Sequence, residues 1–346
     1  MKVQAAVNLL INIAMNTPRI KPIAVLGAGA WGTALALHLA HRGVTVRLWS
    51  MVAAEIDALQ KERENKRFLP GFTFPDHIHA IADLAEVIAD VENVIIAIPS
   101  VAFRQTLIAL RELQAPHLRI ISATKGLEAT SGRLLHEIIK EELGTQTIVA
   151  VLSGPSFAKE VASHLPTSLM LASHHQAFIH DMQNIFTTKN LRIFPTKDVI
   201  GVEVGAIIKN IVAIAVGIAD GMQLGANARS AIITQGLHDM ITLGNTLGAQ
   251  IETLVGLAGA GDLILTCTDD QSRNRRFGLA LGSGKAAEAA EREMGHVVEG
   301  KSNLELALHL AKKQDVKLII ADAMSRLLKG ECDAKTALEL ILDGHA

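Results

Sequence analysis

Lys209 is a charged residue in an apolar helical segment, residues 199–219. Neighbours that share its face at helical spacing are all apolar or small, namely Val202, Gly205, Ala206, Val212, Ala213 and Val216. An ammonium group in such surroundings loses hydration unless it meets a partner or lines a cavity. The small residues leave room for a second group to approach. We favour a partly desolvated proton donor over a lysine that extends past small side chains to solvent.

Asp262 is the candidate partner of Lys209. It follows a glycine-rich stretch, GLAGAG at residues 256–261, and precedes an apolar run, so a tight turn would present it to another helix. Its carboxylate would raise the pKa of the lysine, whereas burial would lower it. An aspartate after glycines is equally often a helix cap, and spacing alone does not separate the two interpretations.

A basic segment follows at residues 268–277, with the sequence TDDQSRNRRF. Ser272 is placed to cap a helix whose first turn carries Arg273 and Asn274. A helix N-terminus together with a forked guanidinium suits a phosphate group. Taken alone, three arginines so close together fit a solvated basic face better, so the segment predicts a phosphate site only in combination with other features.

The sequence GAGAWG at residues 27–32 matches the spacing G-x-G-x-x-G of dinucleotide-binding loops. Gly27 would allow the tight turn, Gly29 would let a pyrophosphate approach the backbone, and Gly32 would let the following helix pack on the preceding strand. An apolar run precedes the loop, a helical stretch follows it, and a second apolar run closes a unit of about 30 residues. This context predicts nucleotide binding rather than a glycine turn between packed elements.

The residue that usually reads the ribose is absent from its expected place. Units that bind NAD commonly carry an acidic residue at the end of the second strand, where this chain has Trp49, Ser50 and Met51. Glu55 lies too far along the chain, and Arg47 lies inside the strand. The sequence therefore predicts NAD or NADP without choosing between them.

Short β-branched runs alternate with helical stretches up to about residue 196. We predict strands at 23–26, 45–49, 94–98, 119–123, 147–152 and 168–172, and helices at 33–41, 53–63, 105–113 and 132–143. Nearly continuous apolar strands separated by helices indicate a parallel sheet with helices on both faces. Ligands bind at the carboxyl ends of such strands, where two loops follow, TKG at 124–126 and SGPS at 153–156.

Beyond about residue 198 the pattern predicts helices alone, at 199–219, 228–247, 304–312 and 320–328. The predicted fold class is α/β, with an N-terminal Rossmann-type doubly wound sheet followed by an all-α C-terminal domain. The sheet would cover residues 21–197 and bind the dinucleotide, and residues 198–346 would carry the catalytic and substrate-binding groups. We expect residues 1–20 to be a loosely ordered extension, with Met15 as an alternative start.

The composition excludes several classes of function. The 346 residues carry a formal net charge of −2, and only 3% are aromatic with no Tyr, so we expect no binding of nucleic acid. Lys209 and Asn210 interrupt the most apolar window, so we expect no membrane span. Cys267 and Cys332 are too few for a disulfide framework, and the histidines show no metal-ligand spacing. We therefore predict no metal and a reducing, cytoplasmic setting.

Seven motifs in this order resemble bacterial NAD(P)-dependent glycerol-3-phosphate dehydrogenase: GAGAWGTALA, ATKGLE, SGPSFAKE, KNIVAIAVGIADG, GLAGAGDLILTCT, QSRNRRFG and GHVVEG. The resemblance extends from about residue 23 to residue 300. It implies that the chain uses NADH or NADPH to reduce a small-molecule substrate, dihydroxyacetone phosphate, to sn-glycerol 3-phosphate for phospholipid synthesis. It leaves the oligomeric state open, with a homodimer as one candidate assembly.

The resemblance also assigns roles to residues. Lys209 corresponds to the proton-transferring lysine and Asp262 to its acidic companion. Substrate contacts are implied at Lys125, Gly154, Ser156, Lys209, Asp262, Ser272, Arg273 and Asn274. Cofactor contacts are implied at Gly27, Gly29, Trp31, Gly32, Lys125, Ala158, Arg273, Val297 and Glu299. The chain departs from the family pattern at Ala30, where a serine is common, and at Met51, where a polar or basic residue is common.

Two other functions stay open at the level of sequence. A ketopantoate- or hydroxyacid-type NAD(P) reductase would share the fold and the lysine, but it would not need the phosphate cluster at residues 272–274. A non-catalytic dinucleotide sensor would bind the cofactor without needing Lys209.

Overall fold

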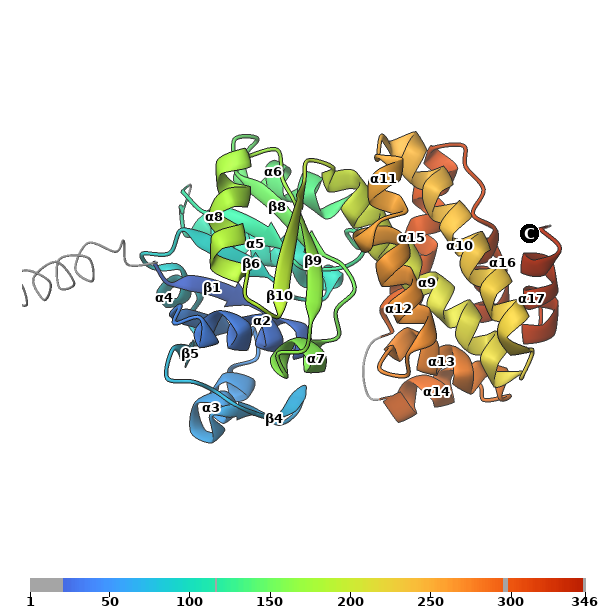
Figure 1. The fold of residues 1–346 in the computed structure, drawn as a ribbon, viewed down its shortest axis with the longest axis horizontal. Coiled ribbons are helices and arrows are strands. Elements are labelled where there is room, and N and C mark those ends of the chain that lie inside the picture. Colours follow the sequence, from blue (N-terminus) through green and yellow to red (C-terminus); the bar gives the residue numbers. More distant parts are fainter. Residues whose placement is uncertain (1–20, 116, 295–297, 345–346) are drawn as a thin grey trace, which may run out of the picture.

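Eight strands form the sheet at the centre of the N-terminal half (Figure 1). A computed structural model describes residues 21–115, 117–294 and 298–344, so the predicted extension at residues 1–20 lies outside the described residues. The strands are β1 (Ile23–Leu26), β2 (Val46–Trp49), β5 (Ile78–Ala80), β6 (Asn93–Ile96), β7 (Arg119–Ser122), β8 (Val149–Ser153), β9 (Thr167–Ala172) and β10 (Leu191–Thr196). Their spatial order is β10-β9-β8-β7-β6-β1-β2-β5. The order reverses between β1 and β6, where doubly wound sheets bind ligands.

Helices cover both faces of this sheet because alternate residues of each strand point to opposite sides. Ile23 and Val25 belong to the core that packs with α2 (Ala30–His41) and α8 (Gln176–Phe186), whereas Ala24 and Leu26 belong to the core that packs with α5 (Phe103–Glu112) and α6 (Leu135–Leu143). The helices of this half are α2 (Ala30–His41), α3 (Ala53–Glu62), α4 (Leu84–Ile88), the 3₁₀ helix η1 (Ser100–Ala102), α5 (Phe103–Glu112), α6 (Leu135–Leu143), α7 (Ala158–Ala162) and α8 (Gln176–Phe186).

The sheet is mixed rather than parallel throughout. The strands from β5 to β8 in the spatial order run parallel, but β9 is antiparallel to β8, and β10 is parallel to β9. A parallel crossover needs a helix that packs across the sheet. The connection after β8 contains only the five-residue helix α7, which contacts α2, so the chain returns along β9 from the edge where β8 ends. The prediction of a parallel sheet was therefore wrong at this end.

Four further strands were not predicted. A hairpin of β3 (Glu64–Asn65) and β4 (Leu69–Thr73) follows α3 and lies below the sheet in Figure 1. β5 and β10 are the two edges of the large sheet. Buried and exposed residues alternate along β10, and an edge strand tolerates Pro195 because it has a side without a neighbour. The predicted elements are present with shifted ends; the helix predicted at 132–143, for example, begins at Leu135.

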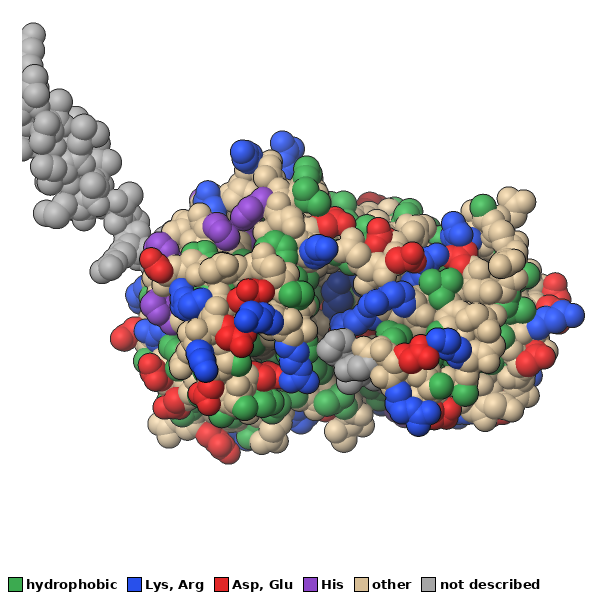
Figure 2. All heavy atoms as spheres, turned by 90° about the horizontal axis from the view of Figure 1, so that it is seen from below, with side chains coloured by type: hydrophobic (Ala, Val, Ile, Leu, Met, Phe, Trp, Pro, Cys, Tyr) green, Lys and Arg blue, Asp and Glu red, His purple; other side chains and the backbone are tan. Residues whose placement is uncertain are grey.

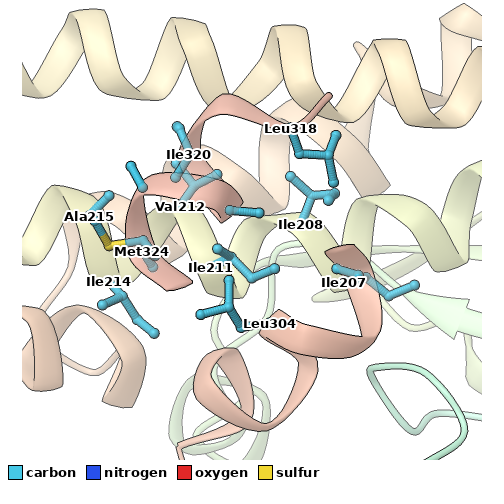
Figure 3. Close-up of a cluster of buried hydrophobic side chains, with 14 of the residues drawn as sticks. Ile207, Ile208, Ile211, Val212, Ile214, Ala215, Leu304, Leu318, Ile320 and Met324 are labelled. Atoms are coloured by element: carbon cyan, nitrogen blue, oxygen red, sulfur yellow. The ribbon is translucent and has the colours of Figure 1, made fainter. Parts of the chain in front are cut away.

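The described residues beyond 198 form helices and no strand, as predicted. They are α9 (Val199–Gly221), α10 (Gly225–Leu247), α11 (Ile251–Leu254), the π-helix η2 (Leu257–Gly261), α12 (Asp262–Thr268), α13 (Arg273–Gly282), α14 (Ala287–Met294), α15 (Glu299–Lys313), α16 (Ile319–Leu328) and α17 (Ala334–Leu342). α9 runs through the middle of this half, and the other helices pack around it (Figure 1). Its isoleucines and valines meet Leu304, Leu318 and Ile320 in one core (Figure 3).

Two stretches of this half are long and apolar enough to be considered as membrane spans, Val199–Gly221 and Ile251–Thr268. The first is α9, and 94% of its apolar window is buried within the protein. Its hydropathy is therefore explained by its place in the core. The second stretch is 44% buried and contains the π-helix η2 between α11 and α12.

Polar contacts hold the two halves together. Glu203, in the first turns of α9, accepts hydrogen bonds from the backbone N–H of His136 at 2.9 Å and from its ring Nδ1 at 2.5 Å. Asn303 on α15 accepts a hydrogen bond from the backbone N–H of Leu127 at 2.8 Å. A Cβ on Gly126 would lie 2.5 Å from Asn303 Oδ1. The loop after β7 is thereby fixed against the helical half.

Candidate active site

The glycine loop lies between β1 and α2. Gly27 has a φ of +119°, and a Cβ there would lie 2.3 Å from the carbonyl oxygen of Ala97. A Cβ on Gly32 would lie 1.9 Å from the carbonyl oxygen of Gly27. At Gly29, the N-cap of α2, a Cβ would meet no atom of the described residues within 4 Å. The chain is therefore open beside the N-cap of α2, and a helix N-terminus with free N–H groups suits a pyrophosphate.

Unpartnered polar atoms lie at the same edge of the sheet. Trp31 in the first turn of α2 has a buried indole Nε1, and Ser122 and Ser153 at the ends of β7 and β8 have buried hydroxyl groups. The described residues offer none of these atoms a hydrogen-bond partner. Because buried polar atoms are normally satisfied, the three atoms indicate that a polar ligand completes this edge.

A hollow of about 230 Å³ lies beyond the end of β2. Its lining residues are Trp49, Ser50, Met51, Ala53, Ala82, Gln105, Thr106 and Ala109. Met51 is 62% exposed, so it presents apolar surface that a flat aromatic base could cover. In doubly wound sheets the adenosine of a dinucleotide lies near the end of the second strand. The glycine loop, the unpartnered atoms and this hollow together fit a nicotinamide dinucleotide.

Lys209 and Asp262 meet at the junction of the two halves. Lys209 Nζ lies 2.5 Å from Asp262 Oδ2, and Lys125 Nζ lies 3.5 Å from the same oxygen. The side chains of Lys209 and Asp262 are only 4% and 1% exposed. Figure 2 shows Lys and Arg side chains gathered in a hollow where the two halves meet. Lys209 therefore meets its carboxylate in buried surroundings and does not extend to solvent.

Charge and burial oppose each other in this group. Burial lowers the pKa of Lys209 to about 7; the charge of Lys125 acts in the same direction, and the Asp262 carboxylate opposes both. Burial also disfavours the charged form of Lys125, but Asp262, the contact with Lys209 and the charge of Glu299 together outweigh this effect, so the pKa of Lys125 lies above its ordinary value. Two ammonium groups share one carboxylate. Lys209 can therefore exchange a proton near neutral pH while Lys125 keeps its charge.

Close packing of η2 on α9 places Asp262. A Cβ on Gly205 would lie 2.4 Å from the carbonyl oxygen of Ala258 and 3.1 Å from the Cα of Gly259. The small residues expected beside the lysine therefore admit the backbone of another element. The expected tight turn is instead the π-helix Leu257–Gly261, which continues into α12. Such π-helical turns are frequent at functional sites.

The start of α13 carries the predicted phosphate cluster. The Oγ of Ser272 accepts a hydrogen bond from the backbone N–H of Arg275 at 3.2 Å and so caps the helix. Asn274 is held on two sides: its Nδ2 donates to Asn210 Oδ1 at 2.9 Å, and its Oδ1 accepts from the N–H of Gly300 at 2.9 Å. An amide has two N–H groups, so these contacts leave one for a ligand.

The arginines of this segment have different surroundings. Arg275 donates to Asp220 at 2.7 Å and also contacts Asp270, so it ties α13 to α9. Arg273 is 46% exposed, and its guanidinium lies 3.5 Å from Glu299. The segment is therefore not a uniform solvated face. One arginine is structural, and another presents a partly exposed guanidinium at the helix N-terminus.

The loop after β8 lies between the glycine loop and the Lys209–Asp262 pair. Gly154 has a φ of +136°, and the hydroxyl of Ser156 donates to its carbonyl oxygen at 3.0 Å. A Cβ on Gly261 would lie 3.8 Å from Pro155, so this loop is next to η2. Ala158 begins α7, which packs on α2. The loop thus connects the surroundings of the glycine loop with those of the aspartate.

Comparison with known proteins identifies the family. The model for the N-terminus of NAD-dependent glycerol-3-phosphate dehydrogenase matches residues 22–179, and the model for its C-terminus matches residues 198–339. The chain belongs to this family. A glycerol-3-phosphate dehydrogenase (NAD(P)+) of Actinobacillus pleuropneumoniae serotype 3 is 47% identical over 321 residues, which cover 92% of this chain and 96% of that protein.

Solved structures separate the dehydrogenase from its competitor. The crystal structure of glycerol-3-phosphate dehydrogenase from Coxiella burnetii is 45% identical with a TM-score of 0.92, covering 94% of this chain and 100% of that chain. A ketopantoate reductase from Ralstonia eutropha is 15% identical with a TM-score of 0.58, covering 93% of this chain and 99% of that chain. The second likeness concerns the fold alone. The comparisons therefore support the dehydrogenase over the ketopantoate-type reductase.

Two buried polar residues of this dehydrogenase were missed in the sequence. Asn210 joins Asn274 and Glu299, since its Oδ1 accepts from the first and its Nδ2 donates to the second at 3.3 Å. Thr266 Oγ1 donates to the backbone carbonyl of Asp262 at 2.6 Å. Their signals were available: Asn210 directly follows the lysine, and Thr266 lies one helical turn beyond the aspartate.

The last two predicted cofactor residues of the dehydrogenase precede and begin α15. Val297 lies outside the described residues. Glu299 is the first residue of α15, and its carboxylate lies 3.5 Å from Arg273 and 3.3 Å from Asn210. Glu299 therefore stands beside the predicted phosphate cluster.

The distance of Glu55 from β2 along the chain was misleading. Ser50 Oγ donates to Glu55 Oε2 at 2.7 Å, because the first turn of α3 carries the carboxylate back to the strand end. Arg47 points elsewhere and donates to backbone carbonyls of α4, including that of Glu86 at 2.8 Å. The dehydrogenase therefore has an acidic group at the end of β2, contributed from the next helix.

Proposed function

We propose that this chain reduces dihydroxyacetone phosphate to sn-glycerol 3-phosphate with NADH or NADPH and so supplies the backbone of glycerophospholipids. The observation that carries the proposal is the buried pair of Lys209 and Asp262, 2.5 Å apart, with Lys125 beside it. A buried ammonium next to a dinucleotide-binding loop suits a reaction in which a ketone oxygen gains negative charge and then a proton.

The residues divide this chemistry among them. When bound, the cofactor supplies the hydride. Lys209 stabilises the charge that develops on the ketone oxygen and gives that oxygen a proton, Asp262 holds the ammonium group in position, and Lys125 adds a second positive charge. Because the pKa of Lys209 is lowered to about 7, the group also accepts a proton readily when the alcohol is oxidised.

The binding roles follow the family pattern. We assign the substrate to Lys125, Gly154, Ser156, Ser272, Arg273 and Asn274, and the cofactor to Gly27, Gly29, Trp31, Gly32, Lys125, Ala158, Arg273 and Glu299. The capped N-terminus of α13 and its guanidinium support the phosphate assignment. The open space at Gly29 supports the pyrophosphate assignment.

We place the cofactor domain at residues 21–197 and the catalytic domain at residues 198–346, since β10 ends at Thr196 and α9 begins at Val199. We also propose a cytoplasmic homodimer. Large apolar side chains on and beside α11 and α12 offer surface to a second copy: Ile251, Val255 and Ile264 are 48%, 50% and 52% exposed. Light scattering that gives the mass of one chain would contradict the dimer.

Oxidation of NADH and NADPH in the presence of dihydroxyacetone phosphate or ketopantoate tests the reaction. We expect turnover with the first substrate only. Lys209→Ala should abolish turnover while the cofactor still binds, and Lys313→Ala, at an exposed lysine of α15, should behave as the wild type. Turnover with ketopantoate alone would contradict the substrate. A Lys209→Ala protein with the wild-type rate would contradict the proton transfer.

A further inference from the structure

The end of β2 holds a small polar cluster formed by Ser50, Glu55 and Arg67. Ser50 is the first residue after the strand and is only 8% exposed; its Oγ donates to Glu55 Oε2 at 2.7 Å and accepts from the N–H of Val52 at 3.3 Å. Arg67 Nη1 donates to the other carboxylate oxygen of Glu55 at 2.8 Å. The carboxylate therefore connects the strand end to the guanidinium. Ser50 also lines the hollow that suits an adenosine.

Arg67 is placed to reach a ligand. It lies between β3 and β4, the hairpin below the sheet in Figure 1. Its side chain is 65% exposed, whereas that of Glu55 is 20% exposed. Its guanidinium lies over the ring of Phe68, 4.8 Å from the ring centre, which steadies it without using its hydrogen-bond donors. An exposed ion pair contributes little to stability, so the guanidinium can change partner at low cost.

Other cations near this strand are engaged elsewhere. Arg47 donates to carbonyl groups of α4 and its end. Arg63 donates to the carbonyls of Ile78 at 2.8 Å and Pro75 at 2.7 Å. Lys66 pairs with Glu62 at 3.3 Å. These three cations are therefore held by other groups. Arg67, in contrast, contacts Glu55 at the end of β2.

We infer that Glu55 and Arg67 together read the 2′ position of the adenosine ribose. Glu55 accepts a hydrogen bond from the free 2′-hydroxyl of NAD(H), and Arg67 binds the 2′-phosphate of NADP(H). A carboxylate at the end of the second strand suits the hydroxyl, and an arginine nearby suits the phosphate. One cluster thus accommodates both cofactors. With NAD(H), Arg67 stays paired with Glu55 and neutralises its charge; with NADP(H), Arg67 leaves Glu55 and binds the 2′-phosphate. The inference rests on dinucleotide binding at the glycine loop.

Equilibrium binding of nucleotide fragments tests the pair without any turnover. Titration calorimetry would measure the affinities of 2′,5′-ADP and 5′-AMP, and then of NADPH and NADH, for the full chain. We expect Arg67→Gln to lower the affinities for 2′,5′-ADP and NADPH at least tenfold and to change the affinities for 5′-AMP and NADH less than threefold. Glu55→Gln should raise the affinity for 2′,5′-ADP, because it removes the repulsion between the carboxylate and the 2′-phosphate. It should lower the affinity for NADH, because it removes the strong acceptor for the 2′-hydroxyl.

Lys66→Gln is the matched control. It removes the same charge from the adjacent residue, whose side chain is 62% exposed and paired with Glu62. Equal losses of affinity for 2′,5′-ADP and NADPH in Arg67→Gln and Lys66→Gln would mean that only the overall positive charge matters, and would overturn the inference. So would an Arg67→Gln protein with an unchanged ratio of NADPH to NADH affinity. A wild-type chain that binds neither dinucleotide would instead overturn the proposed function, and the inference with it.

Discussion

Lys209, Lys125 and Asp262 carry two positive charges and one negative charge in a buried space. Burial disfavours the charged form of each lysine. At Lys209 the carboxylate compensates only in part, whereas at Lys125 the carboxylate and its neighbours outweigh burial and raise the pKa. The surplus positive charge is useful when a ketone oxygen becomes negative, because it stabilises the charge that appears only in the transition state. Burial is the main reason why the pKa of Lys209 lies near 7 rather than near its ordinary value, and the positive charge of Lys125 lowers it further.

The pH dependence of the reaction follows from this pKa. Reduction needs the protonated Lys209, so its kcat should fall as the pH rises through about 7. Oxidation of glycerol 3-phosphate needs the neutral amine, so its kcat should rise through the same range. Stopped-flow or steady-state rates in both directions would show two opposite limbs. Limbs of the same sign in both directions would contradict proton transfer by Lys209.

Two substitutions should move the limb of the reduction in opposite directions. Asp262→Asn removes the charge that raises the pKa of Lys209, so the limb should move to lower pH, and kcat should fall roughly 100-fold. Lys125→Met removes a charge that lowers this pKa, so the limb should move to higher pH. A shift in the same direction for both variants would show that the three groups do not interact as described.

At the scale of elements, α9 and α13 cross through glycines. A Cβ on Gly278 would lie 2.1 Å from the carbonyl oxygen of Ile214 and 2.9 Å from the Cα of Gly217. A Cβ on Gly217 would lie 2.1 Å from the carbonyl oxygen of Arg275. Backbone atoms cannot yield as a side chain can. The distance between these helices, and with it the place of the phosphate cluster, depends on the absence of side chains here.

Gly278→Ala should therefore separate the two helices. We expect a loss of about 1–3 kcal/mol of stability, as for overpacked cores, and a higher KM for dihydroxyacetone phosphate because Arg273 and Asn274 move with α13. Melting temperature and KM are the measurements. The control is Gly284→Ala, where φ is +91° and a Cβ would meet no described atom within 4 Å. It should lose stability through backbone strain and keep its KM; a normal KM in Gly278→Ala would refute the argument.

The sequence predicted elements better than their connections. Apolar runs located β1, β2, β6, β7, β8 and β9, since burial on both faces leaves a strong signal. The direction of β9 depends on how α7 packs, which no local pattern encodes. The meeting of Lys209 and Asp262 was predictable because small residues on one helix face mark a close approach. The contact between Glu55 and Ser50 was not predictable, because their separation along the chain does not show where α3 begins or which way its first turn directs the carboxylate.

At the scale of the molecule, the two halves are held by a buried histidine–carboxylate contact as well as by apolar contacts. Glu203 of α9 accepts hydrogen bonds from the backbone N–H and the ring of His136, at the first turn of α6. The carboxylate is thus placed at a helix N-terminus, where a negative charge is favourable. His136 and Glu203 are only 15% and 4% exposed. The junction between the domains therefore contains a buried contact that can gain or lose a proton.

Burial alone would lower the pKa of His136, but the hydrogen bond and charge of Glu203 outweigh burial, with help from Glu137 and against Lys140, so this pKa is raised. A raised pKa in the folded state gives stability that is fully present below about pH 6.5 and is lost as the pH rises through the folded value. At pH 6 the free energy of unfolding of His136→Gln should therefore be lower than that of the wild type by about 1–3 kcal/mol. Its melting temperature should be lower as well, and both differences should shrink at alkaline pH. His117→Gln, at an exposed histidine of the same domain, should show no such difference.

Calorimetric scans of the three proteins from pH 5.5 to pH 9 would test this prediction. If the difference in stability between His136→Gln and the wild type is constant with pH, the contact is made by a neutral ring. Proton binding would then not strengthen the junction.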